Sequence, residues 1–162
     1  MSTPDPIEYR RASPSRARRG APVVVSSVSS DSHTWNLVFL QLLIEELGFE
    51  VVNLGACVPD DLLVSECVSI RPGLVVISSV NGHGYQDALR VIERLRAHPQ
   101  LARVPMVIGG KLGTSGGQSA EQVEDLLAAG FDAVFDDRTE GPASFRRFVA
   151  SISDGRVVGL EQ

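Results

Sequence analysis

Cysteines are scarce in this chain, and long apolar runs are missing. Cys57 and Cys67 are the only cysteines among 162 residues, and they form neither a C-x-x-C pair nor the spaced pairs of a zinc site. We therefore expect buried, free thiols in a reducing cytoplasm. No apolar run approaches the roughly 18 to 20 residues of a transmembrane helix, so we expect no contact with a membrane.

An excess of positive charge is missing as well. The chain has 15 Lys and Arg against 20 Asp and Glu, a formal net charge of −5 at pH 7. Nucleic-acid surfaces depend on clustered Lys and Arg, so we expect no nucleic-acid partner and look for a small ligand or another protein. The balance of 43% hydrophobic and 22% charged residues is typical of a folded chain, and the length suits one domain.

Residues 1–20 differ from the rest of the chain. They are rich in Pro, Ser and Arg and lack an apolar period, which predicts a flexible basic N-terminal arm. Two roles remain open for it, a docking arm for an acidic partner or nucleic acid and a disordered leader. A signal peptide is not expected, because the following apolar run is short, β-branched and leads into SDSH. We expect one domain over residues 21–155 and a C-terminal tail over residues 156–162.

Apolar runs alternate with amphipathic segments throughout the expected domain. The predicted strands cover residues 22–28, 49–54, 73–79, 104–109 and 131–135. The predicted helices cover residues 35–47, 59–70, 85–97, 119–129 and 142–153. Five successive βα units predict a flavodoxin-like (Rossmann-like) α/β fold, with a five-stranded parallel sheet in the order 2-1-3-4-5 and helices on both faces.

In such a sheet the ligand site lies beyond the carboxyl ends of the strands, where the strand order reverses. The loops after the first, third and fourth predicted strands carry the unusual residues: SDSHTWN (30–36), SSVNGHG (78–84) and GGKLGTSGG (109–117). The loops at the opposite edge read as ordinary connectors, and we assign no role to His98 there.

Several common site types do not fit these loops. A receiver domain needs an aspartate at the end of the third strand, where this chain has Ser78, Ser79 and Val80. The G-x-x-x-x-G-K-[ST] order of a phosphate-binding loop is missing, and Asp87 stands where a dinucleotide fingerprint needs its last glycine. No G-x-S-x-G elbow activates a serine.

What remains is Asp31-x-His33. A carboxylate two residues before a histidine can hold one ring nitrogen, so that the other points outward as a metal ligand. Zinc is not expected, since only His83 lies nearby, and a single protein nitrogen suits a metal already held by a macrocycle. Small residues at positions 78, 109 and 110 would leave room for a bulky organic group. A helix-capping Asp31 beside an incidental His33 stays open as an alternative.

These residues also carry a family resemblance. The sequence resembles the cobalamin-binding domains, whose pattern is D-x-H-x-x-G, then S-x-L, then G-G, and among them the small subunits of glutamate (methylaspartate) mutase. Asp31–His33 matches the first element, Ser78–Val80 the second and Gly109–Gly110 the third, and the separations between them agree with the family. The likeness spans nearly all of residues 21–135.

The resemblance implies a cofactor site. His33 would be the lower ligand of cobalt in adenosylcobalamin, replacing the cofactor's own base, with Asp31 hydrogen-bonded behind it. The displaced nucleotide tail would enter a slot between strands, and the loop before the first helix would border the corrin. The implied cofactor-binding residues are Ser30, Asp31, Ser32, His33, Thr34, Ser78, Ser79, Val80, Gly109, Gly110, Lys111, Leu112, Gly113 and Thr114.

The resemblance also implies a function. Such a subunit presents adenosylcobalamin to a larger barrel-type subunit, in which glutamate and 3-methylaspartate interconvert through radicals, and it is inactive alone. The alternative is a non-enzymatic cobalamin-binding sensor, carrier or degenerate partner-binding subunit. A corrinoid methyl-transfer protein is disfavoured, because the roughly 20 residues before the first strand are too few for the helical cap domain those proteins usually carry.

Three positions depart from the family pattern. Asn36 replaces a glycine, which predicts a weakened or reshaped cofactor site, or an N-cap for a shifted helix. Val80 replaces a leucine, a mild change in packing. Trp35 stands where a small residue is usual, and we expect it to anchor the first helix in the core rather than to stack on the corrin.

Overall fold

The computed structural model describes residues 9–10, 21–79, 84–110, 120–135 and 141–153. Its strands are β1 (Tyr9–Arg10), β2 (Val23–Ser27), β3 (Val51–Gly55), β4 (Leu74–Ser79), β5 (Met106–Gly110) and β6 (Ala133–Phe135). Its helices are α1 (Trp35–Glu46), α2 (Asp60–Ile70), α3 (Gly84–Arg96), α4 (Ala120–Ala129) and α5 (Gly141–Ser153), with a 3-10 turn η1 at Pro99–Leu101.

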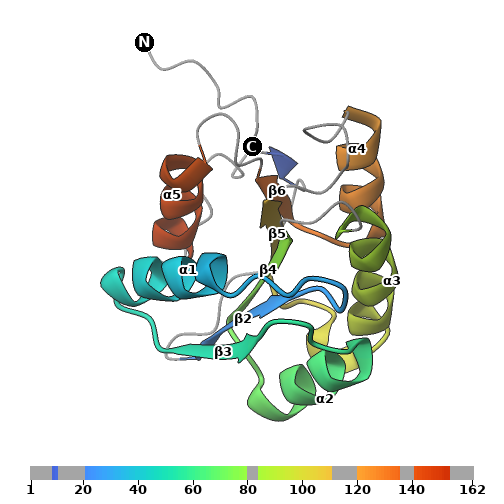
Figure 1. Cartoon of the computed structure of the whole chain (residues 1–162), viewed down its shortest axis with the longest axis horizontal. Coiled ribbons are helices and arrows are strands. Elements are labelled where there is room, and N and C mark those ends of the chain that lie inside the picture. Colours follow the sequence, from blue (N-terminus) through green and yellow to red (C-terminus); the bar gives the residue numbers. More distant parts are fainter. Residues whose placement is uncertain (1–8, 11–20, 80–83, 111–119, 136–140, 154–162) are drawn as a thin grey trace.

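The strands form one sheet in the order β1-β6-β5-β4-β2-β3 (Figure 1). The five strands from β2 to β6 are parallel, and their order is the predicted 2-1-3-4-5. The flavodoxin-like fold is therefore confirmed. The sequence does not predict β1, which pairs antiparallel with β6 at Tyr9 and Val134.

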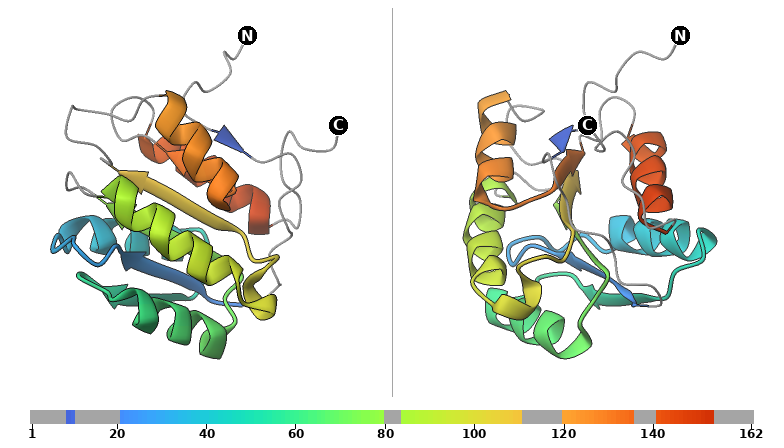
Figure 2. Two further views of the ribbon diagram at one scale, coloured as in Figure 1. Left: turned by 90° about the vertical axis from the view of Figure 1, so that its right-hand side faces the viewer. Right: turned by 180° about the vertical axis from the view of Figure 1, so that it is seen from behind.

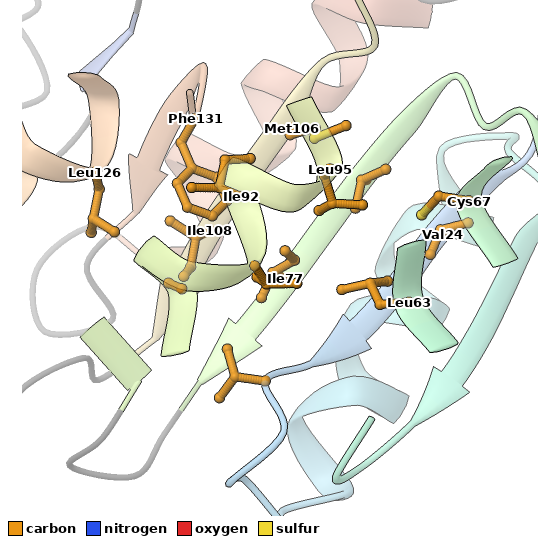
Figure 3. Packing of buried hydrophobic residues seen from close by; sticks show 14 of the residues in the cluster. Val24, Leu63, Cys67, Ile77, Ile92, Leu95, Met106, Ile108, Leu126 and Phe131 are labelled. Atoms are coloured by element: carbon orange, nitrogen blue, oxygen red, sulfur yellow. The ribbon is translucent and has the colours of Figure 1, made fainter. Parts of the chain in front are cut away.

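The sheet separates two apolar cores. Helices α1 and α5 cover one face, and α2, α3 and α4 cover the other (Figures 1 and 2). Because successive side chains of a strand point to opposite faces, Val24 and Ile77 enter the core under α2 and α3, whereas Val25 and Val76 enter the core under α1 and α5. Figure 3 shows the first core, in which Leu63 and Cys67 of α2 lie beside strand residues.

Burial follows the order of the strands. All residues of β2 and β4 are buried, as expected for interior strands with both faces covered, whereas β3 at the sheet edge is half-buried. The predicted helices lie within one or two residues of the observed ones. Gly48, with φ of +97°, follows α1 in the left-handed region that favours glycine. Among the described helices, none is long and apolar enough to cross a membrane.

The two cysteines differ in exposure. Cys67 on α2 is fully buried, as the sequence predicts, but Cys57 is exposed. The prediction of a buried thiol is wrong at Cys57, because this residue lies in the loop that follows β3. Its backbone has a φ of 52°.

We expect a thiol reagent such as DTNB to label one cysteine per folded chain at pH 8. Burial, with the charge of Glu66 as a smaller cause, raises the pKa of Cys67 to about 12 from 9.0, so this thiol stays protonated and covered. The raised pKa also predicts that stability falls as pH rises from 9.0 toward about 12, where the unfolded thiol ionises first. Labelling of a folded Cys57→Ser variant would contradict this account.

Candidate functional site

The carboxyl edge of the sheet holds the Asp31–His33 pair, in the loop between β2 and α1. Asp31 is only 2% exposed, and its Oδ1 accepts a 2.9 Å hydrogen bond from the His33 backbone N–H. The same oxygen lies 2.7 Å from Nδ1 of His33, whose side chain is 60% exposed. With Nδ1 held by the carboxylate, Nε2 is the ring nitrogen left to bind another group.

Backbone contacts fix the position of Asp31. Its N–H donates to the Val28 carbonyl at 3.1 Å, and its carbonyl accepts from the Cys57 N–H at 2.8 Å. Ser27 Oγ also donates to that carbonyl, at 3.2 Å. The ends of β2 and β3 therefore clamp the residue that orients His33.

The N-cap of α1 is Thr34, whose side chain makes no capping hydrogen bond. Asp31 lies three residues earlier, so the alternative that it caps this helix is wrong. Asn36 lies within the first turn of α1, and the prediction that it caps a shifted helix is also wrong.

A polar network ties the same loop to two helices on the other face of the sheet. Ser30 Oγ donates to the Asp87 carboxylate of α3. Arg90 Nη1 donates to Asp87 at 3.0 Å, and Arg90 Nη2 donates to Ser29 Oγ at 3.1 Å. Arg90 also pairs with Asp60 of α2 at 2.5 Å, and the hydrogen bonds to both carboxylates raise the pKa of its guanidinium. The sequence gives no signal for this network, because its members come from three separate segments.

A row of residues crosses the sheet beside α1. Ser27, Ser78, Gly109 and Phe135 are successive register partners on β2, β4, β5 and β6. Ser78 shares the α1 and α5 face with Val76, and its Oγ accepts a hydrogen bond from Nδ2 of Asn36. The predicted residues Ser78 and Gly109 therefore lie side by side, and Asn36 covers the first of them.

Of the two successive glycines on β5, Gly110 is required by the protein's own backbone. A Cβ at Gly110, where φ is +104°, would lie 2.0 Å from the Ser79 carbonyl oxygen. A Cβ at Gly109 would lie 3.2 Å from the Phe135 carbonyl oxygen, a tight contact that requires a shift of a few tenths of an ångström. From the sequence, the small residues here are interpreted as leaving room for a ligand. At Gly110 the close approach of β4 by itself explains why the residue is glycine.

The structure does not bring all the predicted residues together. Ser30, Ser32 and Thr34 are exposed in the loop around His33. Ser79 shares the opposite face of β4 with Val75 and Ile77, and its buried hydroxyl has no hydrogen-bond partner within the described part of the chain. The predicted residues Val80, Lys111, Leu112, Gly113 and Thr114, and also His83, lie outside the described residues.

Trp35 does not anchor the core. Its side chain is 83% exposed, so the prediction of a buried anchor is wrong. Helix α1 buries Leu37, Leu43 and Ile44 instead, which turns Trp35 toward solvent. With the exposed Val38, Phe39 and Leu42 it forms an apolar stripe at positions i, i+3, i+4 and i+7 of α1.

Within the described ranges, no group of three or more His, Cys, Asp or Glu side chains could hold a metal ion. In that part of the chain, His33 contributes one ring nitrogen and has the Asp31 carboxylate behind it. This donor set suits a metal that brings its other ligands with it.

Comparison with known proteins decides the family. The sequence pattern of the B12 binding domain matches residues 21–145. This chain belongs to the B12-binding domain family.

Curated relatives cover most of this B12-binding domain. It is 26% identical over 113 residues to the glutamate mutase sigma subunit of Fusobacterium nucleatum, covering 70% of this chain and 82% of that protein. It is 30% identical over 118 residues to glutamate mutase sigma subunit 1 of Haloarcula marismortui, covering 73% and 77%. It is also 32% identical over 129 residues to the HTH-type transcriptional repressor CarA of Myxococcus xanthus, covering 74% of this chain and 43% of that repressor.

Solved structures share the fold of the B12-binding domain. A cobalamin-binding protein from Desulfitobacterium hafniense superposes with a TM-score of 0.66 at 21% identity, and this chain spans 60% of its length. The chemotaxis protein CheY4 of Vibrio cholerae superposes with a TM-score of 0.61 at 12% identity. These likenesses show a fold that B12-binding and CheY-like domains have in common.

Proposed function

We propose that this B12-binding domain is the cobalamin subunit of an adenosylcobalamin-dependent carbon-skeleton mutase of the glutamate/3-methylaspartate type. It is a cytoplasmic protein that is inactive alone and presents the cofactor to a separate large barrel-type subunit. The observation that carries the proposal is the Asp31–His33 pair, which engages one imidazole nitrogen and leaves the ring exposed at the carboxyl edge of the sheet. Membership of the B12-binding family supplies the class of ligand.

In this proposal Nε2 of His33 would hold the cobalt of the cofactor. Asp31 sets the tautomer and direction of the ring through Nδ1. Because the ends of β2 and β3 clamp Asp31, a buried scaffold determines where the exposed nitrogen lies. Ser30, Ser32 and Thr34, which are exposed around His33, border the corrin.

Ser78 and Gly109, which are register partners on β4 and β5, would hold the nucleotide tail of the cofactor. Gly109 leaves the row across the sheet without a side chain beside Phe135, and Phe135 packs edge-on against Phe145 at a ring-centroid distance of 5.5 Å. A heteroaromatic base would suit this site, because the Ser78 hydroxyl can bond to it and the buried rings of Phe135 and Phe145 lie next to Gly109. The rest of the proposed slot, Val80 and Lys111 to Thr114, lies outside the described residues.

When bound, adenosylcobalamin supplies a radical by homolysis of its cobalt–carbon bond, chemistry that no side chain of the domain provides. The share of this domain is to hold and orient the group. In this proposal the large subunit holds most of the substrate. The similarity to proteins named as glutamate mutase sigma subunits supports the assignment of this chain as a subunit of such an enzyme.

The mutase assignment is tested by reconstitution with a large-subunit homologue, which is first sought in the source genome. We expect glutamate and 3-methylaspartate to interconvert only when both subunits and adenosylcobalamin are present. Two results would contradict the assignment: activity of the large subunit without this chain, or an inactive mixture in which this chain demonstrably binds the cofactor.

A second candidate is a non-enzymatic cobalamin-binding sensor or carrier. The similarity to the transcriptional repressor CarA favours it, because a domain of this family also matches part of a protein that is not named as an enzyme. A sensor changes its shape or assembly when it binds the cofactor and needs no large subunit. Size-exclusion chromatography with and without cobalamin separates a sensor from a mutase subunit, since only the sensor is expected to change its elution without a partner.

A further inference from the structure

Asn36 stands where the family pattern has a glycine, and the structure shows what its side chain does. The Nδ2 of Asn36, in the first turn of α1, donates to Oγ of Ser78 at the end of β4. Asn36 is half-buried and Ser78 is 4% exposed. We call this contact the Asn36–Ser78 latch.

The latch lies over the row where the nucleotide tail is proposed to enter. Ser78 occupies the middle of that row, between Ser27 on β2 and Gly109 on β5. The Ser27 hydroxyl already donates to nearby backbone carbonyls, including that of Asp31. The Ser78 hydroxyl is covered by the Asn36 amide. A group that enters between α1 and β4 to reach Ser78 must displace this amide.

Binding of a metal at His33 does not require the Asn36–Ser78 latch to open. His33 is 60% exposed and lies before α1, so a corrin ring can approach it from solvent. A corrinoid without a nucleotide tail could bind His33 with the latch closed, whereas one with a tail that inserts beside Ser78 could not. The two kinds of corrinoid thus place different requirements on the same site.

We infer that Asn36 sets corrinoid specificity in this domain by closing the latch against the nucleotide tail. The inference rests on the proposed function. Opening the latch costs one partly buried hydrogen bond, which corresponds to a penalty of about fivefold to tenfold in affinity for tailed corrinoids. Corrinoids without a nucleotide tail bind without this loss of affinity.

The test compares two ligands on one substitution. Wild type and Asn36→Ala are titrated with hydroxocobalamin, which carries the tail, and with diaquocobinamide, which lacks it, and binding is followed by visible absorption. Alanine removes the amide and has a higher helix propensity than asparagine, so α1 should stay folded. We expect Asn36→Ala to bind hydroxocobalamin about fivefold to tenfold more tightly and to bind diaquocobinamide with unchanged affinity.

Gln41→Ala is the matched control. Gln41 lies on the same helix and forms another amide bridge to the sheet, in which Asn53 Nδ2 donates to Gln41 Oε1 at 3.1 Å. Its removal should leave both affinities unchanged. Circular dichroism of the three proteins verifies that each is folded.

Three results would overturn the inference: weaker binding of hydroxocobalamin by Asn36→Ala, an equal gain for both ligands, or the same gain in Gln41→Ala. If wild type binds diaquocobinamide and Asn36→Ala has the same affinities as wild type, the proposed function stands and only the role of the latch is rejected. If neither ligand bound to wild type or to Asn36→Ala, the proposed function would fail and the inference with it.

Discussion

Replacing His33 by alanine is expected to weaken cobalamin binding by more than about a hundredfold, since even the partners behind a metal ligand are typically worth 10- to 100-fold. The fold should survive. The ring is 60% exposed, and the backbone N–H of residue 33 still donates to Asp31 in the variant. The cost in unfolding free energy should be about 1.5 to 3 kcal/mol, the value of one hydrogen bond to a charged group.

His98→Ala is the control for this substitution. His98 precedes η1 at the opposite edge of the sheet, so its removal should leave binding unchanged. Circular dichroism and titration of both variants give the comparison. A His33→Ala protein that unfolds would make His33 a structural residue, and one that binds as tightly as wild type would remove it from the site.

Replacing Gly110 by alanine is expected to lower the free energy of unfolding by about 3 kcal/mol or more, because backbone strain and overpacking add at this position. The new Cβ would lie 2.0 Å from the Ser79 carbonyl oxygen, so β4 and β5 must separate where they meet the proposed site. A backbone carbonyl held in a sheet cannot rotate away as a flexible side chain does.

Gly48→Ala isolates the strain alone. Gly48 has a similar φ of +97°, but nothing lies within 4 Å of the position that its Cβ would take. This variant should lose only about 1 to 2 kcal/mol. Urea denaturation with linear extrapolation measures both values. Equal losses would show that the contact with Ser79 does not matter.

The sequence predicts most of the fold because its signals are local. Buried parallel strands need continuous apolar runs, and residues 22–28 and 73–79 supply them at the positions of β2 and β4. The pairing of β1 with β6 escapes prediction, since a strand of two residues carries no period. The error at Trp35 has a related cause, because the face that a short helix buries depends on the packing of Leu37, Leu43 and Ile44.

In the candidate site, too, contacts between residues close in sequence could be predicted and contacts between distant residues could not. Asp31 and His33 are two residues apart, so their contact can be predicted from spacing. The contact of Asn36 with Ser78 joins residues 42 positions apart, and that of Ser30 with Asp87 joins residues 57 apart. Only the assembled sheet places these side chains together. The sequence identifies Asn36 as a departure from the family pattern, but its hydrogen-bond partner requires the structure.

Paramagnetic resonance of the Co(II) form of cobalamin bound to this protein tests the central claim most directly. The protein is prepared twice, with natural histidine and with histidine labelled with nitrogen-15 in the ring. If His33 replaces the cofactor's own base on cobalt, each line splits into a triplet with natural histidine and into a doublet with the labelled form. A triplet that persists after labelling would show that the cofactor keeps its own base, and the account of this site would be wrong.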